Sequence, residues 1–405
     1  MSKYSKIIIF NNNINNISIN DIFNNYFIDD NYITPNNKLF DTINYYKNIL
    51  CTNQSWNILK YLINDYELLS IINNRNHSIS FYKPLSRSFY KLWEILYDNN
   101  LFFNHNIHNL NNITHTINIF CMAEAPGGFI DAFSKLFYNK KFDNYHIDAI
   151  SLINSNYNSN IPTWFSAYNK FKYNNNINII DEIDGNLYNL NNILHCNKNN
   201  IKYDIITADG GFDFSTDYTN QEQLFYKLFY CEVLTAISLQ NINGSFICKI
   251  FDFNTIISHK IIYILYLLYD TIKITKPSIS RNSNSEKYII ATGFKNISNI
   301  TLHKFYDILI NWDTSINFNF NLPHDFITNI NIVNTHFLNK YILCYKQVYK
   351  LFKNINNKKY INNIICNQIK KSTSFCKLYN LKINYNSDFI KLDINTIYHK
   401  YYCHF

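Results

Sequence analysis

Short apolar runs typical of strands alternate with longer helical runs between residues 117 and 292. The chain predicts strands at 117–121, 145–151, 177–180, 203–208, 245–251, 271–275 and 287–292, and helices at 129–138, 221–239 and 255–268. Strands separated by helices of this length require crossover connections, which give a mostly parallel sheet covered on both faces. The pattern therefore predicts an α/β fold whose functional residues lie at the carboxyl ends of the strands.

Two flanking regions differ from this central unit. Residues 1–80 are interrupted by asparagines and predict a mostly helical extension, residues 81–296 predict the central domain, and residues 297–405 predict a basic, mostly helical region. Residues 301–405 contain 13 Lys and 5 acidic residues, whereas the charges of residues 1–300 balance. Lys346, Lys350 and Lys353 share one helical face with Tyr345 and Tyr349 beside them. Such a face suits a nucleic-acid backbone, and a merely solvated helix explains it equally well.

Composition excludes several classes of protein. The 405 residues are 47% hydrophobic and include only 7 Gly, 6 Pro and 9 Cys, which excludes a wholly disordered chain, a collagen-like chain and a disulfide-dense scaffold. The longest apolar run, 261–269, is too short to cross a bilayer, and the first residues lack the apolar core of a signal peptide. We therefore expect no membrane association, reduced thiols and a cytoplasmic protein. We also expect no metal site, because the cysteines lack zinc-ligand spacing. The best histidine candidates for metal binding are His105, His108 and His115, and they have no acid or cysteine beside them.

Asparagine makes up about one residue in six, a bias that fits an AT-rich viral or protist genome. Asparagine is much scarcer across residues 203–290, and we therefore expect the functional residues to lie in this part of the chain.

The first candidate motif is Glu124-Ala-Pro-Gly127-Gly128-Phe129, which follows a predicted strand and opens a helix. Its paired glycines let the backbone pass close to a ligand. The motif lacks the lysine of a phosphate-binding P-loop and the spacing of a dinucleotide fingerprint. A carboxylate before the glycines instead suits a ligand with a cationic amino-acid end, and a plain tight turn is the alternative.

Four charged residues complete the candidate site. Asp209 ends a predicted strand before Gly210-Gly211, Lys249 lies within an apolar strand, and Glu286 enters the next strand from the polar loop 276–285. Burying a lysine inside such a strand costs free energy unless the ammonium is paired or has a function. Alternatively, the strand lies at the edge of the sheet and the ammonium reaches solvent. Lys91 lies on an upstream amphipathic helix and by itself is typical of a surface lysine.

The order Lys-Asp-Lys-Glu with a glycine-rich turn between the first two resembles the FtsJ/RrmJ-like 2′-O-ribose methyltransferases, and most of all their Adrift-type mRNA cap branch. The resemblance covers about 81–295 and includes EAPGGF, TADGGFD followed by NQE, NGSFICKIF and KPSISRNSNSEKYII. It implies a Rossmann-like fold, a mostly parallel central sheet flanked by helices, that binds S-adenosyl-L-methionine. The chain departs from the family at 153–156, which lacks an NPY-like run, and at 184–188, which lacks a second glycine.

The resemblance also assigns roles to residues of this chain. The catalytic tetrad falls on Lys91, Asp209, Lys249 and Glu286. The cofactor-binding residues fall on Glu124, Ala125, Pro126, Gly127, Gly128, Phe129, Ser151, Asp184 and Asp209. We further expect RNA contacts from Arg281, Asn284 and Ser285 and from the basic face of Lys346, Lys350 and Lys353.

These assignments predict methyl transfer to a ribose 2′-OH near the 5′ cap of mRNA, by in-line displacement with Lys249 as general base and no metal. Burial and the Lys91 ammonium are expected to lower the pKa of Lys249, whereas Asp209 and Glu286 oppose that change. Two alternatives stay open: an rRNA methyltransferase of the RrmJ type, and a non-catalytic RNA-binding subunit on the same fold. The expected partners are capped mRNA and other capping or transcription proteins. The expected location is a virus factory or virion for a viral protein and the nucleus for a cellular one.

Overall fold

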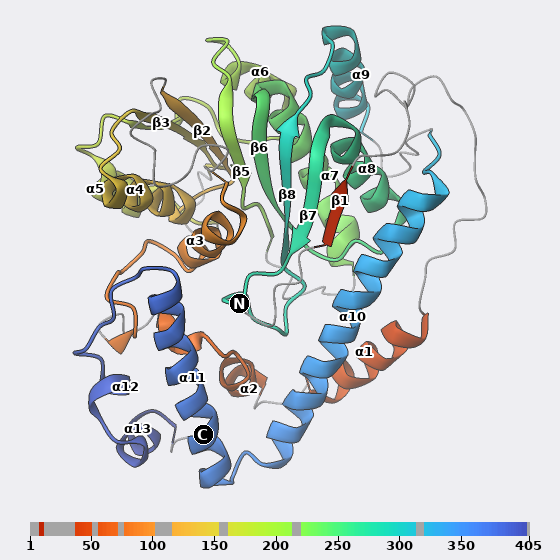
Figure 1. Ribbon diagram of the computed structural model, residues 1–405. Coiled ribbons are helices and arrows are strands. Elements are labelled where there is room, and N and C mark those ends of the chain that lie inside the picture. The colour runs from red at the N-terminus through yellow and green to blue at the C-terminus, as the bar shows by residue number, and fades with distance from the viewer. Residues whose placement is uncertain are drawn as a thin grey trace.

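A mixed sheet forms the centre of the molecule (Figure 1). The computed structural model describes residues 8–11, 37–50, 56–71, 77–101, 116–153, 161–212, 220–312 and 320–402. The strand order is β1-β7-β8-β6-β5-β2-β3-β4. The strands are β1 (Ile8–Asn11), β2 (Ile117–Met122), β3 (Tyr145–Ile150), β4 (Ile177–Ile179), β5 (Tyr203–Ala208), β6 (Gln240–Ile250), β7 (Tyr269–Thr275) and β8 (Lys287–Phe294). The predicted strands are confirmed, and β1 is an additional strand that the sequence pattern did not indicate.

The direction of the strands determines where their ends meet. β2 pairs in parallel with β3 and β5, β3 with β4, and β5 with β6, whereas β8 runs antiparallel between β6 and β7. β1 pairs antiparallel with β7 at the outer edge. The carboxyl ends of the parallel strands and the first residue of β8 therefore lie along one edge of the sheet.

Helices cover both faces of the sheet, as predicted for an α/β fold. In β2, Ile119 and Cys121 face one core and Phe120 and Met122 face the other, because alternate side chains of a strand point to opposite faces. The first face packs against α3 (Ser88–Asn99), α4 (Gly128–Lys140) and α5 (Phe165–Phe171). The second packs against α6 (Leu190–Cys196), α7 (Gln221–Leu239), α8 (Ile256–Leu268) and α9 (Asn299–Ile310). Within the described ranges, no helix has both the length and the hydropathy of a membrane span.

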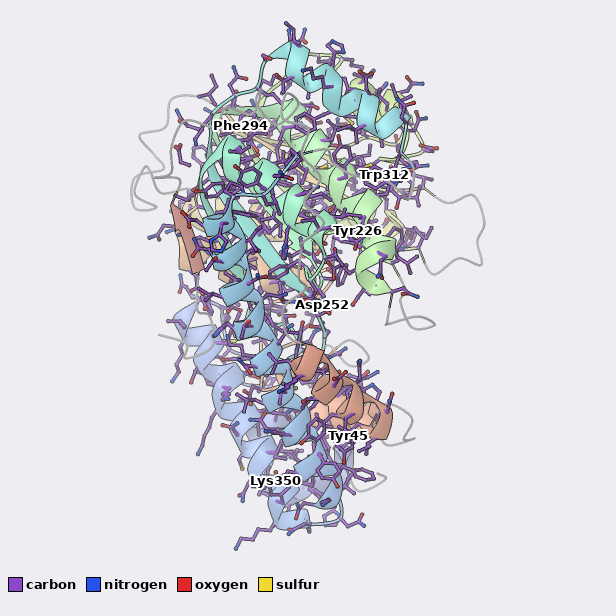
Figure 2. All side chains as sticks on the ribbon, turned by 90° about the vertical axis from the view of Figure 1, so that its right-hand side faces the viewer. Tyr45, Tyr226, Asp252, Phe294, Trp312 and Lys350 are labelled. Carbon is purple, nitrogen blue, oxygen red and sulfur yellow. The ribbon has the colours of Figure 1, made fainter. Side chains whose placement is uncertain are left out.

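A second layer of helices lies beyond the edge that carries the strand ends (Figures 1 and 2). It consists of α1 (Asn37–Leu50), α2 (Trp56–Leu62), the short helix η2 (Glu67–Leu69), α10 (His324–Lys353), α11 (Lys358–Leu378), α12 (Asp388–Lys391) and α13 (Ile394–Tyr401). We call this layer the helical bundle. α10 contacts α8 beside the sheet and also contacts α1 and α2 in the bundle. The bundle thus combines helices from both predicted flanking regions, while α9 packs on α7. The predicted boundaries at 80 and 296 stay predictions.

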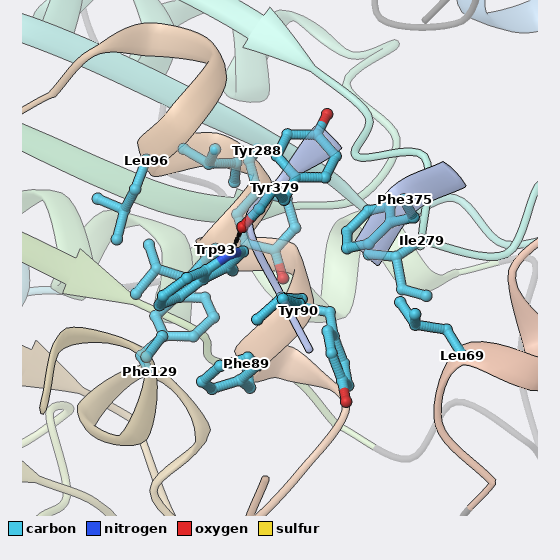
Figure 3. Packing of buried hydrophobic residues seen from close by; sticks show 14 of the residues in the cluster. Leu69, Phe89, Tyr90, Trp93, Leu96, Phe129, Ile279, Tyr288, Phe375 and Tyr379 are labelled. Atoms are coloured by element: carbon cyan, nitrogen blue, oxygen red, sulfur yellow. Dashed lines mark hydrogen bonds between the residues drawn. The ribbon is translucent and has the colours of Figure 1, made fainter. Parts of the chain in front are cut away.

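Helix α3 joins the bundle to the sheet (Figure 3). Its residues Phe89, Tyr90 and Trp93 are fully buried in a cluster that includes Phe129 and Tyr288 from the sheet side. The indole N–H of Trp93 donates a hydrogen bond to the carbonyl oxygen of Tyr379, at the end of α11, over 2.9 Å. Aromatic packing of this kind holds a helix rigidly from both sides. The orientation of α3, and with it that of Lys91, is therefore set by sheet and bundle together.

Candidate active site

Register within the sheet brings the predicted tetrad to one edge. Met122 pairs with Ala208, Ala208 pairs with Cys248, and Lys249 pairs with Tyr288. Asp209 directly follows β5, Lys249 is the penultimate residue of β6, and Glu286 directly precedes β8. These three residues therefore share the edge where the parallel strands end, and α3 adds Lys91 from one face.

Lys249 and Asp209 form the first charged pair. The ammonium Nζ of Lys249 lies 3.2 Å from Asp209 Oδ1 and donates a hydrogen bond to the Asp209 backbone oxygen over 2.6 Å. The hydroxyl of Tyr288 donates to the same Oδ1 over 2.9 Å. A Cβ atom at Gly211 would lie 3.3 Å from Lys249 Nζ, so glycine at this position leaves the ammonium uncrowded. Asp209 is thus oriented from two sides and holds Lys249 in place.

Lys91 and Glu286 form the second pair. Lys91 Nζ lies 2.7 Å from Glu286 Oε2, and both side chains are largely buried. Burial raises the pKa of Glu286, but the ammonium groups of Lys91 and Lys249 outweigh burial and bring the pKa to about 2. The other oxygen, Oε1, is buried and accepts no hydrogen bond from the residues that the structure describes. Glu286 is therefore a carboxylate with one acceptor free for another molecule.

The sequence left open whether burial or the nearby carboxylates dominate the pKa of Lys249. Burial does lower the pKa, but Asp209 and Glu286, with a smaller contribution from Glu232, outweigh it, so the net pKa lies above 10.5. The carboxylates dominate because they act on the ammonium at short range. At neutral pH, Lys249 of the protein alone is an ammonium ion.

Sequence reasoning missed Glu232. It lies on α7, is fully buried, and accepts hydrogen bonds from the Gly210 backbone N–H over 3.1 Å and from Cys248 Sγ over 3.4 Å. Burial raises the pKa of Glu232 to about 8, although Lys249 opposes the shift. It supports the turn after Asp209 and adds to the field at Lys249. The signal was a single acid in an otherwise apolar helical run, Phe229 to Leu234.

The turn between β2 and α4 contains a carboxylate with one unused oxygen. Glu124 Oε1 accepts hydrogen bonds from the backbone N–H groups of Phe129, over 2.6 Å, and Ile130, over 3.4 Å. Glu124 Oε2 is buried, and no described residue donates a hydrogen bond to it. Gly127 has φ of 104°, a conformation that favours glycine, and forms the N-cap of α4. Burial and then Asp209 raise the pKa of Glu124 well above its usual value. A buried, unpaired acceptor of this kind favours a cationic ligand group over a plain turn.

Ser151 and Asp184 lie together after β3 and β4. The Ile153 backbone N–H donates to the Asp184 carbonyl over 2.8 Å, and Asp184 Oδ1 accepts from the side chain of Asn192 over 2.5 Å. Ser151 is buried, whereas Asp184 is exposed. These two predicted cofactor-binding residues are therefore neighbours at the same edge. The departure from the family pattern at 154–156 lies outside the described residues.

Gly185 fixes this contact, and its substitution gives a testable prediction. Its φ is 68°, and a Cβ atom would fall 2.0 Å from the Ser151 backbone oxygen. We expect Gly185→Ala to destabilise the protein by about 1–3 kcal/mol and to weaken binding of the predicted cofactor, because the two segments must separate. Urea unfolding and calorimetric titration measure both effects.

Gly293→Ala is the matched control for Gly185→Ala. Gly293 has φ of 76° but lies near the opposite end of β8. Gly293→Ala should lower the stability of the protein and leave cofactor affinity unchanged. Equal affinity in the Gly185→Ala variant and the unmodified protein would contradict the assignment of this segment to the cofactor site.

The predicted RNA-contacting residues of loop 276–286 have partners within the protein. Arg281 Nη2 lies 3.1 Å from Glu67 Oε1, Asn284 Oδ1 accepts from Lys276 over 2.7 Å, and Ser285 Oγ donates to Gln221 over 2.5 Å. These contacts place the three side chains in the framework of the loop. Their contact with RNA stays a prediction.

The basic face on α10 is present, but its aromatic neighbours differ from expectation. Lys346, Lys350 and Lys353 are exposed, and Lys353 Nζ lies 4.5 Å from the ring centre of Tyr349. Tyr345 is buried and stacks on Trp56, so its predicted place beside the lysines was wrong. Lys350 lies toward the end of the bundle away from the sheet (Figure 2). The predicted role of this face in RNA binding stays a prediction, and His105, His108 and His115 lie outside the described residues.

A family model and several known proteins are similar to parts of this chain. A family model described as FtsJ-like methyltransferase matches residues 84–294. The chain is similar to the cap-specific mRNA (nucleoside-2′-O-)-methyltransferase 1 of Danio rerio, 41% identical over 90 residues, which is 22% of this chain and 11% of that protein. It is also similar to the corresponding methyltransferase 2 of Drosophila melanogaster, 27% identical over 191 residues, which is 44% of this chain and 27% of that protein. The matches thus span only a small part of these relatives. Among solved structures, human methyltransferase-like protein 13 in complex with SAH matches at 14% identity over 56% of this chain and 95% of that chain, with a TM-score of 0.35.

Proposed function

Because the chain belongs to the FtsJ-like methyltransferase family, we propose that it transfers a methyl group from S-adenosylmethionine to a ribose 2′-OH near the 5′ cap of mRNA. The observation that carries the proposal is the meeting of Lys249, Asp209, Lys91 and Glu286 at the edge that also holds the Glu124 turn. The names of the similar proteins support capped mRNA as the substrate class.

The residues at this edge fit the cofactor. The unpaired, buried Oε2 of Glu124 suits the ammonium of its methionine end. Gly128 packs so closely that a Cβ atom would lie 2.0 Å from Ser88 Oγ, which keeps the turn free of a side chain. Ser151 and Asp184 offer polar groups for the adenosine end. When bound, S-adenosylmethionine supplies a methyl group on a positively charged sulfonium.

The chain's own task is to position a ribose hydroxyl and remove its proton. Glu286 Oε1 offers an unpaired acceptor, and Lys91 holds the other oxygen of that carboxylate. Lys249 Nζ is the group assigned to accept the 2′-proton, for which it must first be neutral. The raised pKa of Lys249 disfavours the neutral amine in the protein alone. A second positive charge nearby, such as the sulfonium of a bound cofactor, would lower this pKa.

A transfer assay tests this proposal. Labelled S-adenosylmethionine is incubated with capped RNA, the same RNA without a cap, and rRNA, and the modified nucleotide is mapped in the product. We expect label on capped RNA alone. Cap-independent transfer to rRNA would instead support an rRNA methyltransferase, and RNA binding without transfer would support a non-catalytic subunit. Mapping also decides between the first and second transcribed nucleotide. Location and other capping partners stay predictions outside this assay.

A further inference from the structure

The loop that brings Glu286 to Lys91 is held at both ends by buried charged groups. The loop, residues 276–286, connects β7 to β8. It contains only one of the four tetrad residues, at its last position. Its path therefore determines where the Glu286 carboxylate lies.

Glu94 holds the first half of the loop. Its carboxylate is 1% exposed and accepts hydrogen bonds from the Ser278 backbone N–H over 2.7 Å, the Ser278 hydroxyl over 2.9 Å and the Ile279 N–H over 3.3 Å. No salt bridge to Glu94 occurs among the described residues. Burial raises its pKa to about 7. Burying a carboxylate that has only N–H and O–H partners costs free energy. Packing alone therefore does not explain the position of Glu94.

Glu94 also shares a helix face with Lys91. The two residues are three positions apart on α3, a spacing that places side chains on the same side of a helix. One helix thus binds Glu286 through Lys91 and the start of the loop through Glu94. Ile279, next to Ser278, is buried in the cluster that fixes α3 (Figure 3).

Lys276 closes the second half of the loop. Its ammonium donates hydrogen bonds to the Asn284 backbone oxygen and to Asn284 Oδ1, both over 2.7 Å, and to the Glu286 backbone oxygen over 2.9 Å. Lys276 is 9% exposed. Its ammonium therefore ties the first residue of the loop directly to the main chain of the tetrad glutamate. Burial, and then the charge of Lys287, lower the pKa of Lys276 to about 7, so the charged form that strengthens these hydrogen bonds predominates below neutral pH.

We infer that Glu94 and Lys276 are positioning residues that hold Glu286 in place for the reaction, an inference that rests on the proposed function. Among the described residues, the side-chain hydrogen bonds of Glu94 and Lys276 go to the 276–286 loop and not to the Glu124 turn, so we assign them to the tetrad rather than to cofactor binding. Loss of either contact lets the Glu286 carboxylate move relative to Lys91. A displacement of about 1 Å in a catalytic group lowers turnover by about 10²-fold.

The test uses Glu94→Gln and Lys276→Met, with Lys273→Met on the preceding strand β7 as the matched control. We expect kcat for capped RNA to fall by about 10²-fold in the first two variants. We expect the cofactor Kd to stay within about twofold, since a change of less than 0.5 kcal/mol corresponds to that ratio. The control should match the unmodified enzyme. Unchanged kcat in Lys276→Met and Glu94→Gln would overturn the inference.

A double mutant separates positioning from general destabilisation. In a Glu286→Gln background, Lys276→Met should cause no further loss, because the group that it positions is already altered. An additive loss would overturn the inference. Should Lys276→Met fail to fold, Asn284→Ala removes one acceptor of the ammonium and should give a smaller fall in kcat that likewise disappears in the Glu286→Gln background. An inactive unmodified enzyme would overturn the proposed function first, whereas an active one with unaffected variants overturns only the positioning role.

Discussion

Lys249→Met is expected to lower kcat by about 10²–10⁴-fold, the usual contribution of a general base. Methionine keeps most of the unbranched side chain and removes the ammonium that contacts Asp209. The cofactor Kd should change little, because the Glu124 turn does not depend on that contact. Single-turnover transfer to capped RNA measures the chemical step, and titration calorimetry measures the Kd. Near-normal turnover would remove the assigned role of Lys249.

The pH dependence of the same reaction gives an independent check. The carboxylates of Asp209 and Glu286 hold the pKa of Lys249 above 10.5 despite burial, so the neutral amine is the minor form at neutral pH. If the neutral amine is the base, the rate of the chemical step rises as pH increases, by about tenfold per unit well below the pKa. Asp209→Asn removes a carboxylate that raises the pKa and should shift the profile toward lower pH. A flat profile in the unmodified enzyme would exclude a titrating base in the chemical step.

Glu124→Gln is expected to weaken cofactor binding by about 10- to 100-fold while kcat at saturating cofactor stays close to normal. The amide oxygen can still accept from the N–H groups of Phe129 and Ile130, so the start of α4 is retained. The amide NH₂ would instead meet the ammonium where the unpaired Oε2 now lies. Calorimetric titration with S-adenosylhomocysteine reports the affinity, and thermal unfolding reports whether the fold is kept.

Cofactor affinity should also depend on pH through Glu124. Burial and Asp209 raise its pKa well above normal, so the free protein holds a neutral acid below that pKa. A cationic ligand favours the carboxylate, and binding therefore releases a proton. Affinity must then increase as pH rises toward the raised pKa, and the Glu124→Gln variant should lack this dependence. Equal proton release by both proteins, measured in buffers of different ionisation enthalpy, would contradict the role of Glu124.

The sequence correctly predicted the positions of the candidate site residues where those positions depend only on chain order and strand direction. Asp209, Lys249 and Glu286 each lie beside a strand end, so a mostly parallel sheet brings them together without detailed knowledge of packing. The resemblance to a family added Lys91, whose helix gave no distinct signal by itself. The Glu124 turn was recognisable from its glycines and its position after a strand.

Features that depend on three-dimensional neighbours were not predictable in this way. Tyr345 has the spacing of a surface residue, but Trp56 from the other end of the chain covers it. Burial and two carboxylates oppose each other at Lys249, and only distances decide which dominates. Asn284 was predicted to contact RNA, whereas in the structure it accepts a hydrogen bond from Lys276 within the loop. In each case the deciding partner lies on another segment or across a turn, where periodicity carries no information.

The hydrogen bond from Trp93 to Tyr379 joins residues that are 286 positions apart. During synthesis on the ribosome, the helix that carries Lys91 emerges long before the segment that completes its support. The sheet side of that helix can form early, whereas its bundle side must wait for α11. Nascent chains therefore pass through a stage in which the four charged residues of the candidate site are already translated while α3 still lacks its contact with α11, so the site is completed only after α11 has folded.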